Sequence, residues 1–312
     1  MIKNYISTAE GLIQETEEFA KGCWVNMISP TEEEINFIAH KLQIPLDFLR
    51  DSLDEEERSR IEKEDNNILI IINMPLVTKD EFERPIYDTI PLGIIITNDC
   101  FVTVCLKDNP IFHLFAQNKV KQFYTFMKTR FALQILYLTA TSYLRHLKQI
   151  NKKTDEIENE LHQSMKNKEL FSLLNLEKSL VYFTTSLKSN NIVMQKMLRS
   201  NYLRMYDDDK DLLEDVIIEN QQAIEMAETH TTILSGMMDA FASVISNNLN
   251  MVLKFLTSFT IILALPTMVA SFYGMNVNIP YQNNPYAFVI AIIISIIFAS
   301  ITAFIFWKKR FF

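Results

Sequence analysis

The residues best placed for chemistry are small and polar side chains that recur along one apolar stretch near the C-terminus. In steps of four and three they run Asp239, Ser243, Ser246, Asn250, Leu253, Thr257, Thr260, Ala264, Thr267 and Ser271. Such steps average about 3.5 residues, the period that keeps side chains on the seam of a helical bundle. In lipid, a polar face is favourable only against protein or water. Identical helices around an axis would therefore line a narrow, hydroxyl-rich passage.

A second interpretation of this face is close helix packing, because Ser, Thr and Ala let helix backbones approach one another. Pro266, in the middle of the stretch, predicts a kink or hinge rather than a ligand. Directly after the face come Tyr273, Gly274, Met275 and Asn276. The glycine permits a tight turn, and a ring of Asn276 carbonyls could accept hydrogen bonds from waters around an ion.

Two apolar runs in this part of the chain are long enough to cross a membrane. Residues 253–272 contain one charge, Lys254 at the edge, and residues 287–306 contain none. Each run spans a hydrocarbon core of about 30 Å, a length that argues against two buried helices of a soluble core. Basic residues flank both runs, with Lys308, Lys309 and Arg310 after the second. Positive flanks face the cytoplasm, so we expect both termini there and the loop 273–286 outside the cell membrane.

The remainder of the chain is acidic. The 312 residues hold 30 Lys and Arg against 38 Asp and Glu, and residues 251–312 account for four of the basic and none of the acidic ones. The first 250 residues thus hold 26 against 38, a net charge of −12. This balance argues against a nucleic-acid partner, which needs clustered basic residues, and favours divalent cations or plain solubility.

The sequence has no spacing typical of a catalytic or cofactor site. Cys23, Cys100 and Cys105 indicate reduced cytosolic thiols, and the five histidines form no close pair that would bind zinc. A Gly-rich nucleotide loop is missing among only five glycines, and no Ser-His-Asp arrangement is visible. We therefore expect neither an enzyme nor a chain with an organic cofactor.

The elements that position the polar face can also be predicted. Residues 1–110 are expected to form an α/β sheet domain, with a helix start within residues 29–34 and strands at 68–74, 92–97 and 101–106. Residues 111–250 contain no proline and a single glycine, Gly236, which predicts long antiparallel helices. Breaks are expected near 166–168, 188–191 and 207–210, where polar residues cluster.

One helix is expected to run on from about Asp211 without a stop signal into the first span of a transmembrane pore module, residues 251–312. About 60 residues would make it roughly 90 Å long, too long to lie inside a compact domain. The predicted fold is an α+β/α membrane protein with an N-terminal cytosolic α/β domain and long antiparallel helices. Its longest helix continues into the first of two C-terminal transmembrane helices.

The two spans, the residues Tyr273 to Asn276 that end the first, the short outer loop and the basic tail resemble the CorA family of divalent-cation transporters. The likeness covers the whole chain and includes segments 55–64, 68–74 and 174–198 of the cytosolic part. It implies a homopentamer with a funnel-shaped cytosolic domain whose long helices converge on a pore. It also implies a selectivity filter at Gly274, Met275 and Asn276, where Asn276 holds a hydrated Mg²⁺ at the outer mouth.

The same resemblance assigns further residues. It implies pore-lining positions at Asn250, Leu253, Thr257, Ala264 and Thr267 and a hydrophobic constriction at Leu256, and the polar face adds Thr260 and Ser271. It also implies regulatory Mg²⁺ bound between neighbouring cytosolic domains by Asp215 and Asp239, with Asp80, or next Glu81, from the facing subunit. Some relatives carry acidic residues soon after the signature, whereas 277–286 has none.

The function expected from these features is potential-driven Mg²⁺ uptake across the cell membrane by a channel or transporter that cytosolic Mg²⁺ closes. Mg²⁺ would be both the transported and the regulatory ion, and the partners would be other copies of the chain and membrane lipid. Three alternatives stay open: Co²⁺, Ni²⁺ or Zn²⁺ as the ion, efflux in place of uptake, and a membrane-anchored structural or signalling protein.

Overall fold

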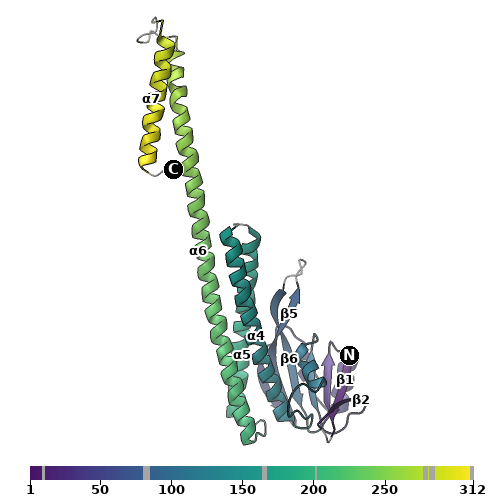
Figure 1. Ribbon diagram of the computed structural model, residues 1–312. Coiled ribbons are helices and arrows are strands. Elements are labelled where there is room, and N and C mark those ends of the chain that lie inside the picture. Colours follow the sequence, from purple (N-terminus) through teal and green to yellow (C-terminus); the bar gives the residue numbers. More distant parts are fainter. Residues whose placement is uncertain are drawn as a thin grey trace. The chain divides into compact units, whose positions relative to one another are not determined.

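The computed structural model describes residues 1–8, 11–79, 85–163, 167–200, 202–276, 280 and 285–309. It divides into two compact units, Met1–Gly236 and Met237–Phe312. The first unit contains a sheet and several helices, the second contains two long apolar helix segments, and one helix contributes to both (Figure 1).

The elements follow one another in the predicted order, with strands first and long helices after. The strands are β1 (Ile2–Ser7), β2 (Ile13–Thr16), β3 (Trp24–Ile28), β4 (Arg60–Glu64), β5 (Asn67–Lys79), β6 (Pro85–Ile96) and β7 (Phe101–Cys105). The helices are α1 (Glu32–Leu42), α2 (Leu46–Asp51), α3 (Pro110–Ala116), α4 (Lys128–Gln163), α5 (Asn167–Arg199), α6 (Asp207–Tyr273) and α7 (Ala287–Lys308). The predicted fold class is confirmed, including the single helix that extends to the Tyr273 signature.

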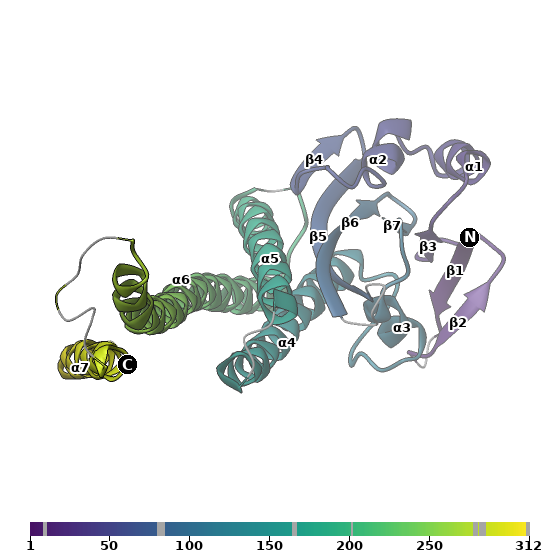
Figure 2. The same cartoon turned by 90° about the horizontal axis from the view of Figure 1, so that it is seen from above.

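The sheet has seven strands in the order β2-β1-β3-β7-β6-β5-β4. Only the β3–β7 pair is parallel among the pairs the structure describes. Helices α1 and α2 lie on one side of the sheet and α3, α4 and α5 on the other (Figure 2). Because both faces are covered, the central strands need apolar residues at every position.

The isoleucine-rich strand β5 shows this two-sided burial directly. Leu69 and Ile71 pack into the cluster on the α1 and α2 side. Ile68, Ile70 and Ile72 pack into the cluster that contains residues of α3, α4 and α5. Alternate side chains of a strand point to opposite faces, so the unbroken apolar run that predicted a strand also fixes its place in the middle of the domain.

The helix start predicted within residues 29–34 is confirmed, and the structure places its capping box at Thr31, with Pro30 before the helix rather than inside it. The Thr31 hydroxyl accepts a hydrogen bond from the Glu34 backbone N–H at 3.2 Å, and the Glu34 carboxylate accepts one from the Thr31 N–H at 2.9 Å. Such a cap contributes about 1 kcal/mol because it satisfies backbone donors that a helix leaves unpaired.

The predicted strand and helix bounds needed correction in four places. Strands β5 and β6 are longer than predicted, since they pair as a hairpin from Ile68 opposite Ile96 to Lys79 opposite Pro85. The predicted break at 188–191 is wrong, because these residues lie inside α5. A break at 117–127, between α3 and α4, was missed, and α6 begins at Asp207 rather than Asp211.

The break near 188–191 is absent because the polar residue there is buried rather than solvated. Asn190 is fully buried, and its side chain bonds the backbone of Asn73 on β5 twice, at 2.8 Å to the N–H and 2.8 Å to the carbonyl. Ser59 donates to Asn190 at 2.9 Å, and the Tyr143 hydroxyl donates to the Asn73 carbonyl at 3.0 Å. These bonds pair the backbone N–H and carbonyl of Asn73, where β5 extends beyond the end of β4, and they attach α5 to the sheet.

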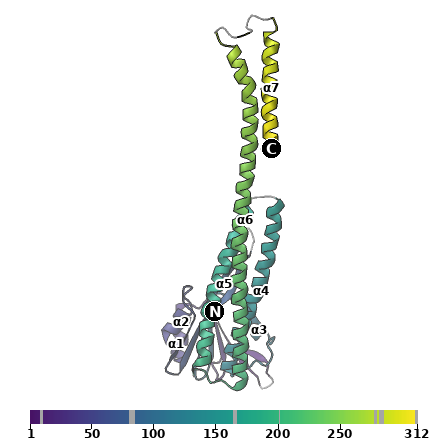
Figure 3. The same cartoon turned by 90° about the vertical axis from the view of Figure 1, so that its left-hand side faces the viewer.

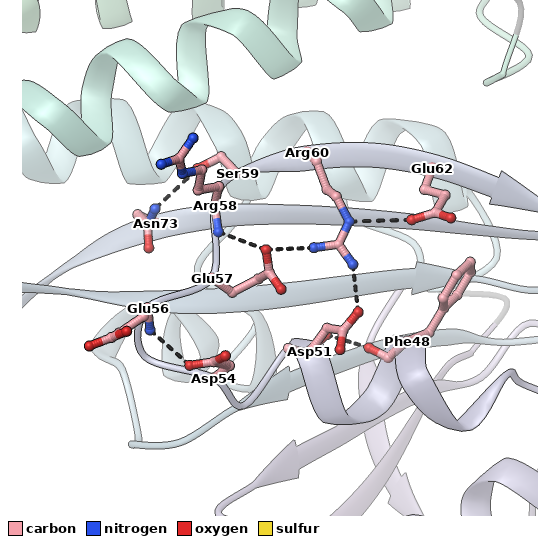
Figure 4. A network of polar contacts seen from close by, with 11 residues as sticks. Phe48, Asp51, Asp54, Glu56, Glu57, Arg58, Ser59, Arg60, Glu62 and Asn73 are labelled. Carbon is pink, nitrogen blue, oxygen red and sulfur yellow. Dashed lines mark hydrogen bonds and ion pairs between the residues drawn. The ribbon is translucent and has the colours of Figure 1, made fainter.

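Beside this contact, one arginine holds the connection between α2 and β4 (Figure 4). Arg60 contacts Asp51 at 2.6 Å, Glu57 at 2.8 Å and Glu62 at 3.3 Å. The Arg60 side chain is 30% exposed, so each pair contributes at most about 1 kcal/mol. The guanidinium of Arg60 is therefore shared by these three carboxylates.

Helix α5 and the first part of α6 run antiparallel inside the first unit. Asn220 donates to the Leu187 carbonyl at 3.1 Å. The Lys188 ammonium lies 2.6 Å from Glu228. Further along, Ser235 donates to Glu177 at 2.8 Å. These contacts fix the rotation of α6 about its own axis as far as Ser235.

We predict that Asn190→Ala lowers the unfolding temperature of the first unit by roughly 5–10 °C, because the buried Asn73 N–H and Ser59 hydroxyl lose their partner. The matched control is Asn191→Ala, since the Asn191 side-chain oxygen is buried without a hydrogen-bond partner among the described residues. Differential scanning fluorimetry of the full chain in detergent measures both. Equal shifts for the two variants would contradict this role of Asn190.

Candidate functional site

The residues predicted to line a pore are all on the surface of the isolated chain. The exposed residues are Asn250, Leu253, Leu256, Thr257, Thr260, Ala264, Thr267 and Ser271. By contrast Ser258 is only 1% exposed, and Ile262, Leu265, Val269 and Tyr273 are half-buried. From Ser258 to Tyr273 the helix therefore has a narrow packed face, and its other positions are exposed, apolar ones such as Phe259 and Leu263 included. Residues 249–257 are exposed on every side of the helix.

The packed residues and the predicted pore residues lie on opposite sides of α6. Successive residues are about 100° apart around a helix axis. On that projection the packed residues gather around Ser258 and Val269, and the predicted pore residues centre roughly opposite, around Ala264 and Ser271. Helix α7 lies alongside this part of α6 (Figures 1 and 3). Among the described residues, nothing covers the hydroxyl-bearing face, called here the pore face.

The hydroxyls of the pore face are oriented by the helix backbone. Thr260 donates to the Leu256 carbonyl at 2.8 Å, and Thr267 donates to the Leu263 carbonyl at 3.2 Å. Because these protons are used within the helix, the hydroxyl oxygens offer lone pairs to the outside. Such oxygens accept hydrogen bonds from the first-shell waters of a cation.

The signature residues close the end of α6. The Gly274 N–H donates to the Ala270 carbonyl at 2.9 Å, and the Met275 N–H donates to the Phe272 carbonyl at 3.2 Å. Gly274 does not adopt the left-handed backbone conformation, which among the described glycines occurs at Gly11 and Gly22. The turn forms here without the conformational freedom that only glycine has.

A side chain at Gly274 would also fit within the isolated chain. A Cβ there would lie 3.4 Å from the Ala270 carbonyl oxygen and 3.6 Å from that of Ser271, distances close to ordinary contact. Met275 and Asn276 are exposed beside it. The glycine permits this turn, as expected, but nothing within the described chain requires one.

Pro266 lies inside α6, which is assigned as helix without interruption to Tyr273. Its ring nitrogen has no proton, so the carbonyl one turn earlier, on Ile262, receives no hydrogen bond from it. The hinge expected at this position stays a prediction.

Among the described residues, the candidate regulatory carboxylates Asp215 and Asp239 belong to no group that could hold a metal ion. Asp215 and Asp239 are both exposed on α6, at a spacing of 24 residues in the sequence. Asp80 and Glu81 lie outside the described residues. Among the residues that are described, no three His, Cys, Asp or Glu side chains are grouped to hold a metal ion. Any site that uses Asp215 or Asp239 therefore requires ligands from elsewhere.

Two long apolar helices define the class of protein. The first of them carries an exposed hydroxyl-bearing face that ends at the signature residues. Helix α6 contains an 18-residue window of mean hydropathy 1.9, and α7 one of 2.9, and both windows are almost wholly unburied. A soluble core helix would be buried by its own chain. The pair thus has the features of two membrane spans, one of which carries hydroxyls.

Comparison with known proteins identifies the family. The family model described as CorA-like Mg²⁺ transporter protein matches residues 19–310. The chain belongs to the CorA family of Mg²⁺ and Co²⁺ transporters, which are integral membrane proteins and not enzymes.

Individual relatives match over nearly the full length. The cobalt/magnesium transport protein CorA of Methanocaldococcus jannaschii is 30% identical over 292 residues, which are 92% of this chain and 90% of the relative. The magnesium transport protein CorA of Helicobacter pylori is 24% identical over 296 residues, 92% of this chain and 89% of the relative.

Solved structures agree with the fold. The complete structure of the CorA magnesium transporter from Methanocaldococcus jannaschii has a TM-score of 0.84 at 27% identity and covers 99% of this chain and 98% of its own. The full-length CmaX protein, at 16% identity and a TM-score of 0.74, covers 99% of this chain and 97% of its own, and shares the fold.

Proposed function

We propose that this chain forms a magnesium channel in which several copies place the pore face of α6 around a common axis. The observation that carries the proposal is the exposed hydroxyl face on the side of α6 opposite the residues packed in its own chain. In a bilayer that face would be unfavourable against hydrocarbon. Covering it with the same face of identical chains makes it the wall of a water-filled passage.

The assembly is a closed ring of identical subunits, and the number proposed is five, from the resemblance to the family. A closed ring forms when one side of each chain contacts a different side of the next copy and the rotation closes, which turns one face of every copy toward the axis. Gly274 supports a ring that is tight at the mouth. Because a side chain there fits within one chain, the approach of neighbouring copies gives a reason for glycine at this position.

Selection would act on the hydrated ion. Mg²⁺ releases water reluctantly and prefers octahedral oxygen ligands. The Asn276 side-chain carbonyls at the mouth, followed by the Thr267 and Thr260 oxygens, accept hydrogen bonds from first-shell water. Neutral acceptors hold the ion weakly enough for it to leave. Gly274 and Met275 complete the filter by keeping the asparagines at the end of the helix.

The driving force proposed is the membrane potential, with both termini in the cytoplasm. A potential that is negative inside contributes about 2.3 kcal/mol per charge per 100 mV, hence roughly 4.6 kcal/mol for a divalent cation. The basic tail Lys308, Lys309 and Arg310 supports this orientation through the positive-inside rule. Uptake would then need no nucleotide hydrolysis.

The gate proposed is the apolar part of the pore face, at Leu253, Leu256 and Ala264. A ring of such side chains blocks ions by excluding water. Cytosolic Mg²⁺ would hold the ring closed by bridging Asp239 and Asp215 to Asp80 of a neighbouring copy. Carboxylates brought together repel unless a cation neutralises them, so low Mg²⁺ would loosen the ring.

A second candidate ion is Co²⁺, because the relative from Methanocaldococcus jannaschii is named a cobalt/magnesium transport protein. Oxygen acceptors on a hydrated ion discriminate weakly between divalent cations of similar size. Flux measurements in liposomes with Mg²⁺, Co²⁺, Ni²⁺ and Zn²⁺ separate these ions. A membrane anchor without transport would show no flux with any of them.

We predict that Asn276→Ala lowers Mg²⁺ uptake into liposomes at least tenfold, because the filter loses the amide oxygens that hold first-shell water. Uptake is measured with a Mg²⁺-sensitive dye under an imposed inward-negative potential. Asn247→Ala is the control, since Asn247 is an exposed asparagine on α6 away from the filter. Uptake by Asn276→Ala at the parent rate would contradict the filter.

For the gate, we predict that Asp239→Ala combined with Asp80→Ala abolishes the protection from proteolysis that Mg²⁺ gives the parent protein. The reason is that the bridging ion loses ligands on both sides of the interface. Asp211→Ala, another exposed carboxylate on α6, should leave the protection intact. The gate proposal fails if the double variant is protected by Mg²⁺ as well as the parent is.

A further inference from the structure

A cavity of about 860 Å³ opens in the first unit, at the end where α6 begins. Its walls come from four separate segments: the turn between β4 and β5, the turn between β6 and β7, the first turn of α4, and the chain leading into α6. The volume lies within the range of about 300–1,000 Å³ typical of small-molecule sites. None of the residues assigned to the pore or the gate lines it.

The charge of the cavity is opposite to that of the unit around it. Its lining contains four basic residues, Lys63, Lys128, Arg130 and Arg204, and two acidic ones, Asp208 and Asp209, a net charge of +2. Residues 237–312 hold four of the 30 basic and one of the 38 acidic residues, so residues 1–236 hold 26 against 37, a net of −11. A positive cavity in so negative a unit favours an anionic ligand.

Two of the four cations are only partly neutralised by their own chain. The Arg130 Nε lies 3.4 Å from the buried carboxylate of Asp209. The Lys128 ammonium donates to the carbonyls of Thr97 at 2.6 Å and Asn98 at 2.7 Å, and burial lowers the pKa of Lys128. Both residues occupy the first turn of α4, where the helix dipole disfavours positive charge, and that turn has no acidic residue.

The other two cations, Lys63 and Arg204, make no ion pair within the described part of the chain. They come from segments far apart in the sequence, yet they line the same cavity. Like charges brought together repel unless a counter-charge lies between them. A polyvalent anion is the ligand that would neutralise Lys63 and Arg204 and also contact the basic residues in the first turn of α4.

Aromatic side chains border the same space. Tyr206 is 70% exposed and Phe126 is 53% exposed, although both line the cavity. Tyr202 also lines it, and the Lys196 ammonium lies 5.7 Å from the centre of the Tyr202 ring. Exposed rings beside a cationic cavity suit a ligand that joins a flat ring to several negative charges.

We propose that this cavity binds a nucleoside polyphosphate, with its phosphates near Lys63, Arg204 and the first turn of α4 and its base against Tyr206 or Phe126. The site binds without hydrolysis, and it does not depend on the channel proposal. Its place at the start of α6 puts a cytosolic metabolite in contact with the helix that carries the pore face.

The test is calorimetric titration of the purified full-length protein in detergent with ATP, in buffer that contains EDTA. We expect saturable binding at one site per chain. Lys63→Glu and Arg204→Glu should each weaken it at least tenfold, because a charge-assisted contact becomes repulsive. Lys41→Glu is the matched control, since it makes the same charge change on the exposed surface of α1, outside the cavity, and should bind as the parent does.

The contribution of the base is tested by comparing ATP with tripolyphosphate. We expect Tyr206→Ala combined with Phe126→Ala to weaken ATP binding about tenfold and to leave tripolyphosphate binding unchanged. Equal affinity of the parent for both ligands would overturn the nucleotide assignment. No saturable ATP binding, or equal effects of Lys63→Glu, Arg204→Glu and Lys41→Glu, would overturn the site. Mg²⁺ uptake is measured separately, so neither result bears on the channel.

Discussion

A hydroxyl-bearing helix face is unfavourable against hydrocarbon, and α6 has such a face that no other described part of the chain covers. The other side of the helix is packed at Ser258 and half-buried at Val269. The isolated chain is thus incomplete as a membrane protein. In the proposed channel, association of several copies would resolve the conflict, because the same surface that is unfavourable in lipid would become the lining of an aqueous path. The proposed assembly and the proposed transport both depend on this one constraint.

The first unit supplies the rigidity that such a helix needs. Side-chain contacts between α5 and α6 recur from Asn220 to Ser235. Helix α5 is itself fastened to β5 by Asn190. A ligand that altered this packing would act on α6, which continues unbroken to Tyr273. Ion bridges at Asp239 and an anion in the cavity at the start of α6 would both act in this way.

Short sequence patterns gave correct predictions where residues close together in the chain decide the structure of a segment. The β-branched run of β5 is buried on both faces, the Thr31 cap satisfies its own helix, and the apolar run 287–306 forms a helix that is long and apolar enough to span a membrane. The pore face was predicted from a 3.5-residue period, which is visible in the sequence whatever surrounds the helix, and its role as a pore lining stays a prediction. These features depend on near neighbours in the chain.

Features that depend on distant residues were missed or misjudged. Polar residues around Asn190 suggested a break, because the sequence does not show that Asn73, over a hundred residues away, would take up the amide. The cavity has no motif, since Lys63 and Arg204 meet only in the folded unit; its one local signal was Lys128 and Arg130 at the start of a helix. The pairing of Asp80 with Asp239 stays a prediction, because it joins two chains.

The proposed water-filled axis is tested most directly by measuring whether an aqueous reagent reaches neighbouring residues on the two sides of α6. Thr257→Cys and Ser258→Cys differ by one position, yet Thr257 lies on the pore face and Ser258 is 1% exposed. In liposomes at low Mg²⁺, a charged methanethiosulfonate reagent should label Thr257→Cys and spare Ser258→Cys, measured by intact mass against the parent with its three buried cysteines. Failure to label Thr257→Cys at both low and high Mg²⁺ would contradict a water-filled axis beside this helix.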